Sequence, residues 1–170
     1  RTQPLFDNAG DHLYWGSGSP SYEAISVSDR PAPDALREAR SGFSPARAYY
    51  TQLPRVSQRV RDLAVSITQG LDNNYDRAVA IEGFLQTDFG YTLELPRSAR
   101  EATLEYFLFD RREGHCEYFS TAMVILLRSL GVHAREVNGF LGGQWNDFGQ
   151  YLAVTQNEAH SWVEVWFPGY

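Results

Sequence analysis

The chain contains one cysteine, Cys116, whose position is typical of a nucleophile. It follows Gly114 and His115 at the predicted start of an apolar helix. Because the first N–H groups of a helix have no intrahelical partners and favour negative charge, they would stabilise a thiolate there. The Cys116 N–H would face an oxyanion formed during acyl transfer, and Gly114 would permit a tight turn and close substrate approach. A cysteine that serves only as a small buried apolar residue would more naturally lie in mid-helix.

A thiolate nucleophile needs a base, and His160 is the candidate. It lies at the start of the last predicted strand, on the face opposite Val163 and Val165. The other histidines are expected to have different roles. His115 is interpreted as loop structure or a substrate contact, because neighbours at a helix start diverge, and the two remaining ones, His12 and His133, are expected to be structural.

A third group usually orients such a histidine, and the sequence does not identify it. Glu164 shares the predicted face of His160, but four strand residues of about 3.3 Å each separate them by roughly 13 Å, too far for a hydrogen bond. Asn157, Glu158 and Asp147 fall in predicted loops, where the sequence leaves their positions open.

Composition restricts the remaining site types. A single cysteine excludes an intramolecular disulfide and a four-cysteine zinc site. The four histidines show no metal-ligand spacing, and no acidic cluster resembles a calcium-binding loop. We therefore expect no cofactor and no metal. The net charge of −6 argues against nucleic acid as a partner, because phosphate binding needs a basic face.

Hydrophobic periodicity predicts helices followed by strands, which is typical of the α+β class. The central helix is apolar almost all round, as expected for a buried helix, and Gly131 should end it. The polar connection over residues 142–149 resembles a hairpin. The predicted helices cover residues 56–69, 75–87, 99–109 and 116–130, and the predicted strands of an antiparallel sheet cover residues 132–141, 151–155 and 161–167.

Residues 1–54 differ in composition from the rest, being rich in Gly, Ser, Pro and Asp, with one strand-like stretch over 22–27. We interpret them as an irregular or β-rich lead-in, or the tail of a preceding domain, with a boundary at the Leu53–Pro54 step. Residues 55–170 would form the catalytic core. The sequence starts at Arg1 without a signal-peptide pattern, so we expect it to be a piece of a longer protein.

From residue 53 onward the sequence resembles the transglutaminase-like superfamily. Three motifs in order carry the resemblance: GHCEYFSTAM at 114–123, LGVHAR at 130–135 followed by VNGFLGG at 137–143, and AHSWVEVW at 159–166. Two upstream stretches are similar to the bacterial, membrane-anchored branch of that superfamily, the TgpA-type protein-glutamine γ-glutamyltransferases. These stretches are RVRDLA at 59–64, and YDRA at 75–78 followed by FGYT at 89–92.

The resemblance implies a papain-like core and a Cys–His–Asp triad, with Cys116 and His160 at the family's positions. The family's aspartate follows on the next strand, after a Pro-Gly-Tyr-like turn, so it is expected beyond Tyr170. The resemblance also implies a periplasmic domain of a bacterial inner-membrane protein.

The expected reaction is transfer of an acyl group from a glutamine side chain to an amine, with release of ammonia. The partners would be a glutamine-containing protein or peptide and an amine donor. Two alternatives stay open. Water could resolve the same acyl-enzyme, as in a cysteine protease or amidase, or the fold could serve as a non-catalytic binding module.

Overall fold

The computed structural model describes residues 5–7, 12–14, 30–39 and 45–170, which divide into two compact units, Arg1–Arg30 and Pro31–Tyr170. In the first unit, β1 (Leu5–Asp7) pairs antiparallel with β2 (His12–Tyr14). The strand expected over residues 22–27 lies outside the described residues.

The second unit starts before the expected step at Leu53–Pro54, because residues on the N-terminal side of that step contact the core. It begins with α1 (Pro33–Glu38) and the 3₁₀ helix η1 (Pro45–Thr51). Arg37 of α1 donates to the Asp76 carboxylate at 2.9 Å. Arg128 donates to the carbonyl of Gln52 at 2.9 Å, and Leu53 packs against the hydrophobic core.

Three helices supply most of that core. They are α2 (Gln58–Ile67), α3 (Asn74–Asp88) and α5 (Cys116–Ser129), each within a few residues of its predicted range. The α3 helix starts where the Asn73 side chain accepts a hydrogen bond from the Asp76 N–H at 2.8 Å. The largest side chains that are almost fully buried come mainly from these helices: Val60, Ile81, Phe107, Leu126, Leu127 and Val132.

The third predicted helix, over 99–109, is displaced and irregular. A single turn, α4 (Leu104–Tyr106), starts only after Thr103, whose hydroxyl accepts from the Tyr106 N–H at 3.2 Å. It continues as the π-helical turn η2 (Phe107–Arg111). The prediction missed the late start because the cap is a local hydrogen bond that apolar periodicity does not register.

The C-terminal strands, which were expected to form one antiparallel sheet, form two separate antiparallel pairs. β5 (Ala134–Phe140) pairs with β8 (Ala159–Val165), and Gly139 lies opposite His160. β6 (Gln144–Asn146) lies within the stretch expected to be a connection and forms a hairpin with β7 (Tyr151–Ala153), which is followed by the 3₁₀ turn η3 (Gln156–Glu158). Two glycines with positive φ at the start of the hairpin, Gly142 and Gly143, interrupt the strand direction after β5.

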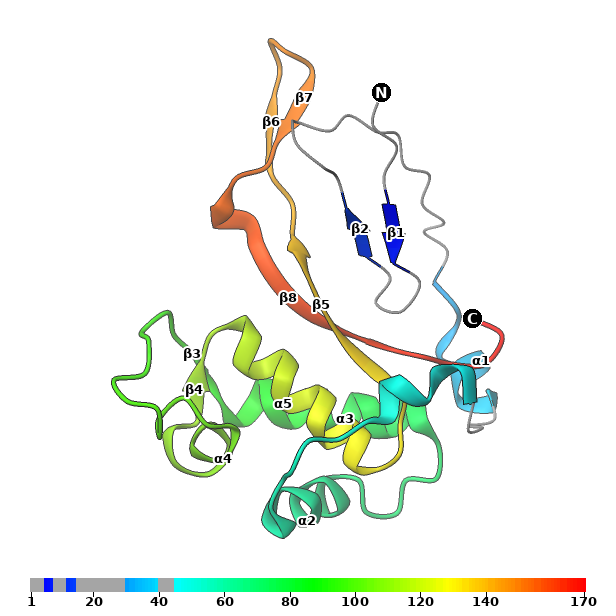
Figure 1. The fold of residues 1–170 in the computed structure, drawn as a ribbon. Helices are drawn as coiled ribbons and strands as arrows, with labels where there is room; N and C mark the ends of the chain where they lie inside the picture. The colour runs from blue at the N-terminus through cyan, green and yellow to red at the C-terminus, as the bar shows by residue number, and fades with distance from the viewer. Residues whose placement is uncertain (1–4, 8–11, 15–29, 40–44) are drawn as a thin grey trace. The chain divides into compact units, whose positions relative to one another are not determined.

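Within the second unit, α5 has strands on one side and helices on the other (Figure 1). It contacts the β5–β8 pair on one side and α2 and α3 on the other. Six α5 residues are buried, which confirms the prediction of a central buried helix. Helices and an antiparallel strand pair around one core confirm the α+β class.

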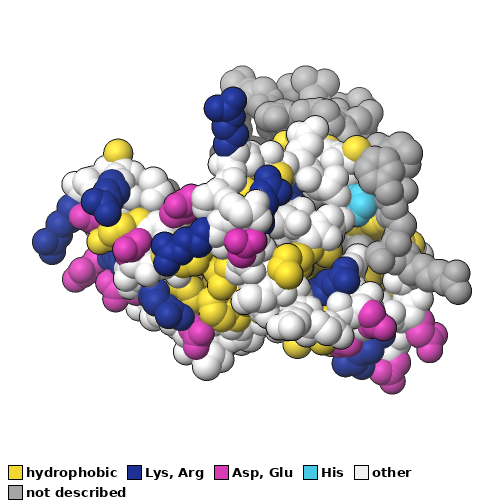
Figure 2. Space-filling view, turned by 90° about the horizontal axis from the view of Figure 1, so that it is seen from below, with side chains coloured by type: hydrophobic (Ala, Val, Ile, Leu, Met, Phe, Trp, Pro, Cys, Tyr) yellow, Lys and Arg dark blue, Asp and Glu magenta, His cyan; other side chains and the backbone are white. Residues whose placement is uncertain are grey.

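Charged side chains of both signs are interspersed over the face shown in Figure 2. Ion pairs among the described residues include Arg37 with Asp76 and Arg112 with Asp88. Such an arrangement offers no broad basic surface on that face. Among the described residues, no helix combines the length and the hydrophobicity that a bilayer crossing requires.

Candidate active site

The chain segment that leads to Cys116 is held by a short parallel strand pair. After η2, Arg112 takes the left-handed conformation, with φ of 54°, and turns the chain into β4 (Glu113–Gly114). β4 pairs in parallel with β3 (Gly90–Tyr91), which belongs to the extended segment after α3. The Gly90 N–H donates to the Arg112 carbonyl at 2.9 Å, and the Thr92 N–H to the Gly114 carbonyl at 3.0 Å. These bonds fix the backbone on the N-terminal side of Cys116.

Gly114 is required for packing rather than for an unusual backbone angle. A Cβ atom at this position would lie 2.9 Å from the Cβ of Tyr118, closer than real side chains approach. The Tyr118 ring is itself held between His115, at a centroid distance of 4.9 Å, and Phe107, at 5.5 Å. We expected Gly114 to permit a tight turn. The structure shows instead that glycine is needed here because Tyr118 leaves no room for a side chain.

Cys116 is the first residue of α5 and is half-buried, not sealed in the core. Residues three, four and seven positions along a helix share its face, and these are Phe119, Ser120 and Met123. All three line a cavity of about 550 Å³ bounded by α3, α5 and β8. Cys116 therefore lies one helical turn from Ser120, on the α5 face that borders this cavity.

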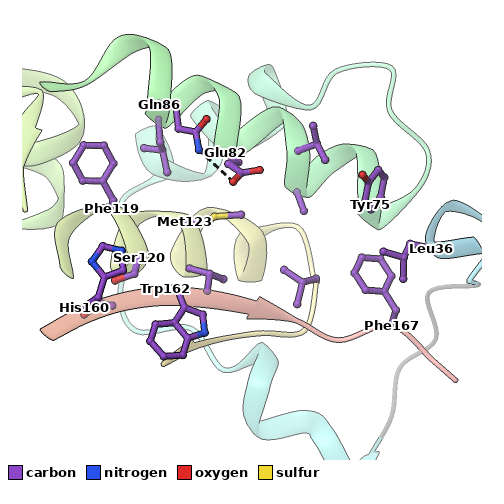
Figure 3. Close-up of a pocket in the computed structure, with 16 residues that line it drawn as sticks. Leu36, Tyr75, Glu82, Gln86, Phe119, Ser120, Met123, His160, Trp162 and Phe167 are labelled. Carbon is purple, nitrogen blue, oxygen red and sulfur yellow. Dashed lines mark hydrogen bonds between the residues drawn. The ribbon is translucent and has the colours of Figure 1, made fainter. Parts of the chain in front are cut away.

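His160 lines the same cavity from β8. Figure 3 shows its imidazole beside Ser120 and Phe119, with Trp162 further along the strand. Both sequence-predicted site residues therefore lie at the N-terminal end of α5. Among the described residues, no hydrogen bond joins the Cys116 thiol to the His160 imidazole. His160 itself lines the cavity, whereas Cys116 lies one helical turn before Ser120, which lines it too.

None of the candidate orienting residues hydrogen-bonds to His160 within the described part of the chain. Glu164 pairs with Arg135 at 2.8 Å, in agreement with the expectation that it lies too far from the imidazole. The Glu158 carboxylate accepts from the N–H and the hydroxyl of Thr155, at 2.6 and 2.7 Å. Asp147 lies in the turn between β6 and β7, where its carbonyl accepts from Gln150.

Sequence reasoning missed two polar residues on the α5 side of β5, Glu136 and Asn138. The Glu136 carboxylate accepts hydrogen bonds from Ser120 at 2.7 Å and from Thr121 at 3.2 Å, which ties α5 to β5. Asn138 accepts from Ser161 of β8 at 2.5 Å. Two polar residues at alternate positions, on a strand face that should be buried, were the signal that could have revealed them.

The remaining described histidines occupy other surroundings. His133 is buried against Trp166, with ring centroids 5.2 Å apart, as expected of a structural residue. Burial lowers the pKa of His133 below its ordinary value, and the Arg47 charge lowers it further. His115 borders a smaller cavity of about 210 Å³ together with Glu117 and Tyr118. Among the described residues, no group of His, Cys, Asp or Glu side chains has the arrangement of a metal site.

A half-buried cysteine at a helix start, with a histidine from an antiparallel strand at the same end of the helix, is an arrangement found in papain-like cysteine enzymes. The family comparison agrees with this geometry. The model of the transglutaminase-like superfamily matches residues 61–170, well over half of the chain. The chain belongs to the transglutaminase-like superfamily.

Two curated relatives are similar to this superfamily member. An uncharacterised protein, YebA, of Bacillus subtilis is 44% identical over 128 residues, which are 70% of this chain and 17% of the relative. A protein-glutamine γ-glutamyltransferase of Pseudomonas aeruginosa is 38% identical over 139 residues, which are 80% of this chain and 20% of the relative. The chain thus spans about a fifth of the length of the curated relatives it matches.

Solved structures show the same fold. The periplasmic domain of TgpA from Pseudomonas aeruginosa has a TM-score of 0.67 and 37% identity, over 78% of this chain and 46% of that one. A putative cysteine protease from Cytophaga hutchinsonii has a TM-score of 0.55 and 17% identity, over 75% of this chain and 40% of that one. The second likeness concerns the fold alone.

Proposed function

We propose that this domain is a protein-glutamine γ-glutamyltransferase, in which Cys116 is the nucleophile and His160 the general base. One observation carries the proposal. Phe119 and Ser120, which follow Cys116 by three and four positions on α5, line the same cavity as His160, in a chain of the transglutaminase-like superfamily. The similarity to the glutamyltransferase of Pseudomonas aeruginosa supports the choice of reaction.

The reaction runs in two halves with balanced proton transfers. His160 takes the thiol proton, and the thiolate attacks the glutamine γ-carboxamide to form a tetrahedral oxyanion. When the C–N bond breaks, the imidazolium gives its proton to the leaving nitrogen, which departs as ammonia and leaves a thioester on Cys116. An amine then attacks the thioester and His160 takes the amine proton. The C–S bond breaks, and the imidazolium returns its proton to the sulfur, which restores the thiol.

The partners proposed for this site are a protein or peptide that presents glutamine and a second molecule that presents a primary amine. The crystallised relative is a periplasmic domain, which supports a periplasmic location for this domain too. The parent protein would be anchored in the inner membrane. Fractionation of cells that express the tagged parent protein, followed by protease treatment of spheroplasts, would test this location.

The function is tested by incubating the protein with a glutamine-containing peptide, with and without a fluorescent primary amine. Mass spectrometry of the peptide distinguishes the outcomes, and ammonia release gives the rate. Attachment of the amine supports a transferase. Conversion of glutamine to glutamate in the presence of amine, without attachment, would indicate a hydrolase. No change of the peptide, together with no labelling of Cys116 by a thiol reagent, would indicate a binding module.

A further inference from the structure

The smaller cavity beside the start of α5 is not used by the acyl-transfer steps above. It has a volume of about 210 Å³ and lies where α4 contacts α5 (Figure 1). Pockets for drug-sized ligands begin at about 300 Å³, so this cavity has room for one side chain rather than a stretch of peptide. Its lining residues are Ala102, Leu104, His115, Glu117, Tyr118 and Thr121.

Helical spacing separates this cavity from the larger one. Thr121 follows Glu117 by four positions and Tyr118 by three, so these three residues share one face of α5. Phe119 and Ser120 lie on another face and line the larger cavity. Cys116 lines neither, but it is the residue directly before Glu117. A substrate that reacts at Cys116 therefore has a one-side-chain cavity next to its point of attachment.

The wall of this cavity is largely apolar. Ala102 and Leu104 line it from the segment that leads into α4, and Tyr118 contributes an aromatic ring. Leu104 also packs against the hydrophobic core, which holds this wall in place. The hydrocarbon stem of a long side chain gains by lying along such a surface while its polar end stays near water.

The Glu117 carboxylate adds a negative charge at the exposed side of the cavity. Within the described part of the chain it accepts no hydrogen bond and forms no ion pair, and His115, which lines the same cavity, does not pair with it either. By comparison, Glu82 in the larger cavity accepts from Gln86 at 3.3 Å. An apolar wall with an unpaired carboxylate at its exposed side complements a side chain that has an apolar stem and a cationic end.

The cation that fits here is one that does not react. The amine that resolves the thioester must lose its charge before it attacks, and a carboxylate beside it would hold it as an ammonium ion. A basic side chain close to the reactive glutamine carries its charge throughout. The Cα atoms of Cys116 and Glu117 are about 3.8 Å apart. Residues two positions apart in an extended peptide lie on one side of it, about 6.6 Å apart. A long side chain one or two positions from the glutamine can span this separation.

We propose that the cavity lined by Leu104, Glu117 and Tyr118 binds a basic side chain of the glutamine-bearing peptide, one or two residues from the reactive glutamine. Its stem lies along the apolar wall and its charge pairs with Glu117. This inference rests on the proposed acyl-transfer function and names a class of acyl donor for it.

The test uses glutamine peptides that carry one arginine, placed one or two positions before or after the glutamine. Each peptide is paired with one in which citrulline, a neutral side chain of similar shape, replaces arginine. Arginine is not a primary amine, so it does not act as an acyl acceptor. Ammonia release at a fixed concentration of the fluorescent amine gives kcat/KM for each peptide.

The variants are Glu117→Gln, Glu117→Lys and the matched control Glu105→Gln, which removes an exposed carboxylate of α4 that does not line the cavity. The quantity compared is the ratio of kcat/KM for arginine and citrulline peptides on one variant. Any effect of the substitution on the reactivity of Cys116 cancels in this ratio.

We expect the wild type and Glu105→Gln to favour arginine by about 5-fold at one peptide position, the effect of one exposed ion pair, and added salt to reduce this preference. Glu117→Gln should use both peptides equally well. Glu117→Lys should favour citrulline, an inversion that a misfolded variant does not produce.

No preference in the wild type, or the same preference in wild type and Glu117→Gln, would overturn the proposal and leave the transferase function intact. Absence of ammonia release from every peptide in the wild type would instead overturn the function, and this inference with it.

Discussion

The two ends of α5 differ in how their backbone groups are satisfied. At the C-terminal end, the Val132 N–H donates to the Leu127 carbonyl at 3.1 Å and the Gly131 N–H to the Arg128 carbonyl at 3.0 Å. Gly131 has φ of 76°, so this is a Schellman motif, and it confirms the expected helix end. The chain continues directly into the buried residues Val132 and His133.

At the N-terminal end, by contrast, the helix is left partly open. The cap residue, His115, provides no side-chain hydrogen bond, and its carbonyl accepts from the N–H groups of Tyr118 and Phe119. In the described part of the chain, the N–H groups of Cys116 and Glu117 have no partner. Backbone hydrogen bonds close the C-terminal end of α5, whereas at its N-terminal end, where the proposed nucleophile lies, the first two N–H groups have no partner among the described residues.

The largest expected effect is at the open end. Cys116→Ala should lower amine incorporation to the uncatalysed background, because the proposed reaction runs through a thioester on the Cys116 sulfur. The free energy of unfolding should change by less than about 1 kcal/mol, since a small, half-buried side chain is lost. Urea denaturation and the amine-incorporation assay measure the two quantities. Retained turnover in Cys116→Ala would show that Cys116 is not the nucleophile.

His160→Ala should lower the rate of acyl transfer by about 10³-fold or more, since the thiol then lacks its base. At neutral pH the rate of Cys116 alkylation by iodoacetamide should fall too. His115→Ala serves as the matched control, because His115 is the neighbour of Cys116 but contacts Tyr118 instead of lining the larger cavity. An alkylation rate that is the same in His160→Ala and wild type would contradict the dyad.

A pair of glycine substitutions compares the two ends directly. In Gly114→Ala the new Cβ would collide with Tyr118, so we expect a destabilisation of about 1–3 kcal/mol together with reduced activity, because the start of α5 must shift. Gly131→Ala meets no atom within 4 Å and strains only the left-handed backbone, which costs about 1–2 kcal/mol. Gly131→Ala should keep wild-type activity below its unfolding transition. Equal activity in Gly114→Ala and Gly131→Ala would show that the two ends of α5 do not differ in their importance for activity.

The smallest expected effect is a pH dependence of the free energy of unfolding, caused by His133, which follows the C-terminal end of α5. Because the pKa of buried His133 is lowered on folding, the unfolded chain binds more protons near that pKa. The free energy of unfolding should therefore fall as the pH drops below about 6.5, the ordinary histidine value. His133→Gln should flatten this dependence in urea titrations between pH 7.5 and 5. An unchanged slope would show that other groups cause it.

Local sequence patterns were sufficient to predict the main helices and the family. The apolar periodicity gave α2, α3 and α5 nearly their observed bounds, and Gly131 marked the end of α5 because a left-handed residue there is a local requirement. The motifs around Cys116 and His160 gave the family. The start of α4 was predicted less well, since its Thr103 cap competes with a weak periodic signal.

The tertiary structure decided how these elements meet. Whether Gly114 must be glycine depends on Tyr118, and the role of Glu136 depends on Ser120. A sequence pattern specifies which face of an element is buried, through a period of 3.6 or 2 residues. It does not specify how far one element slides along another, because that offset is fixed only when all side chains of the core pack together.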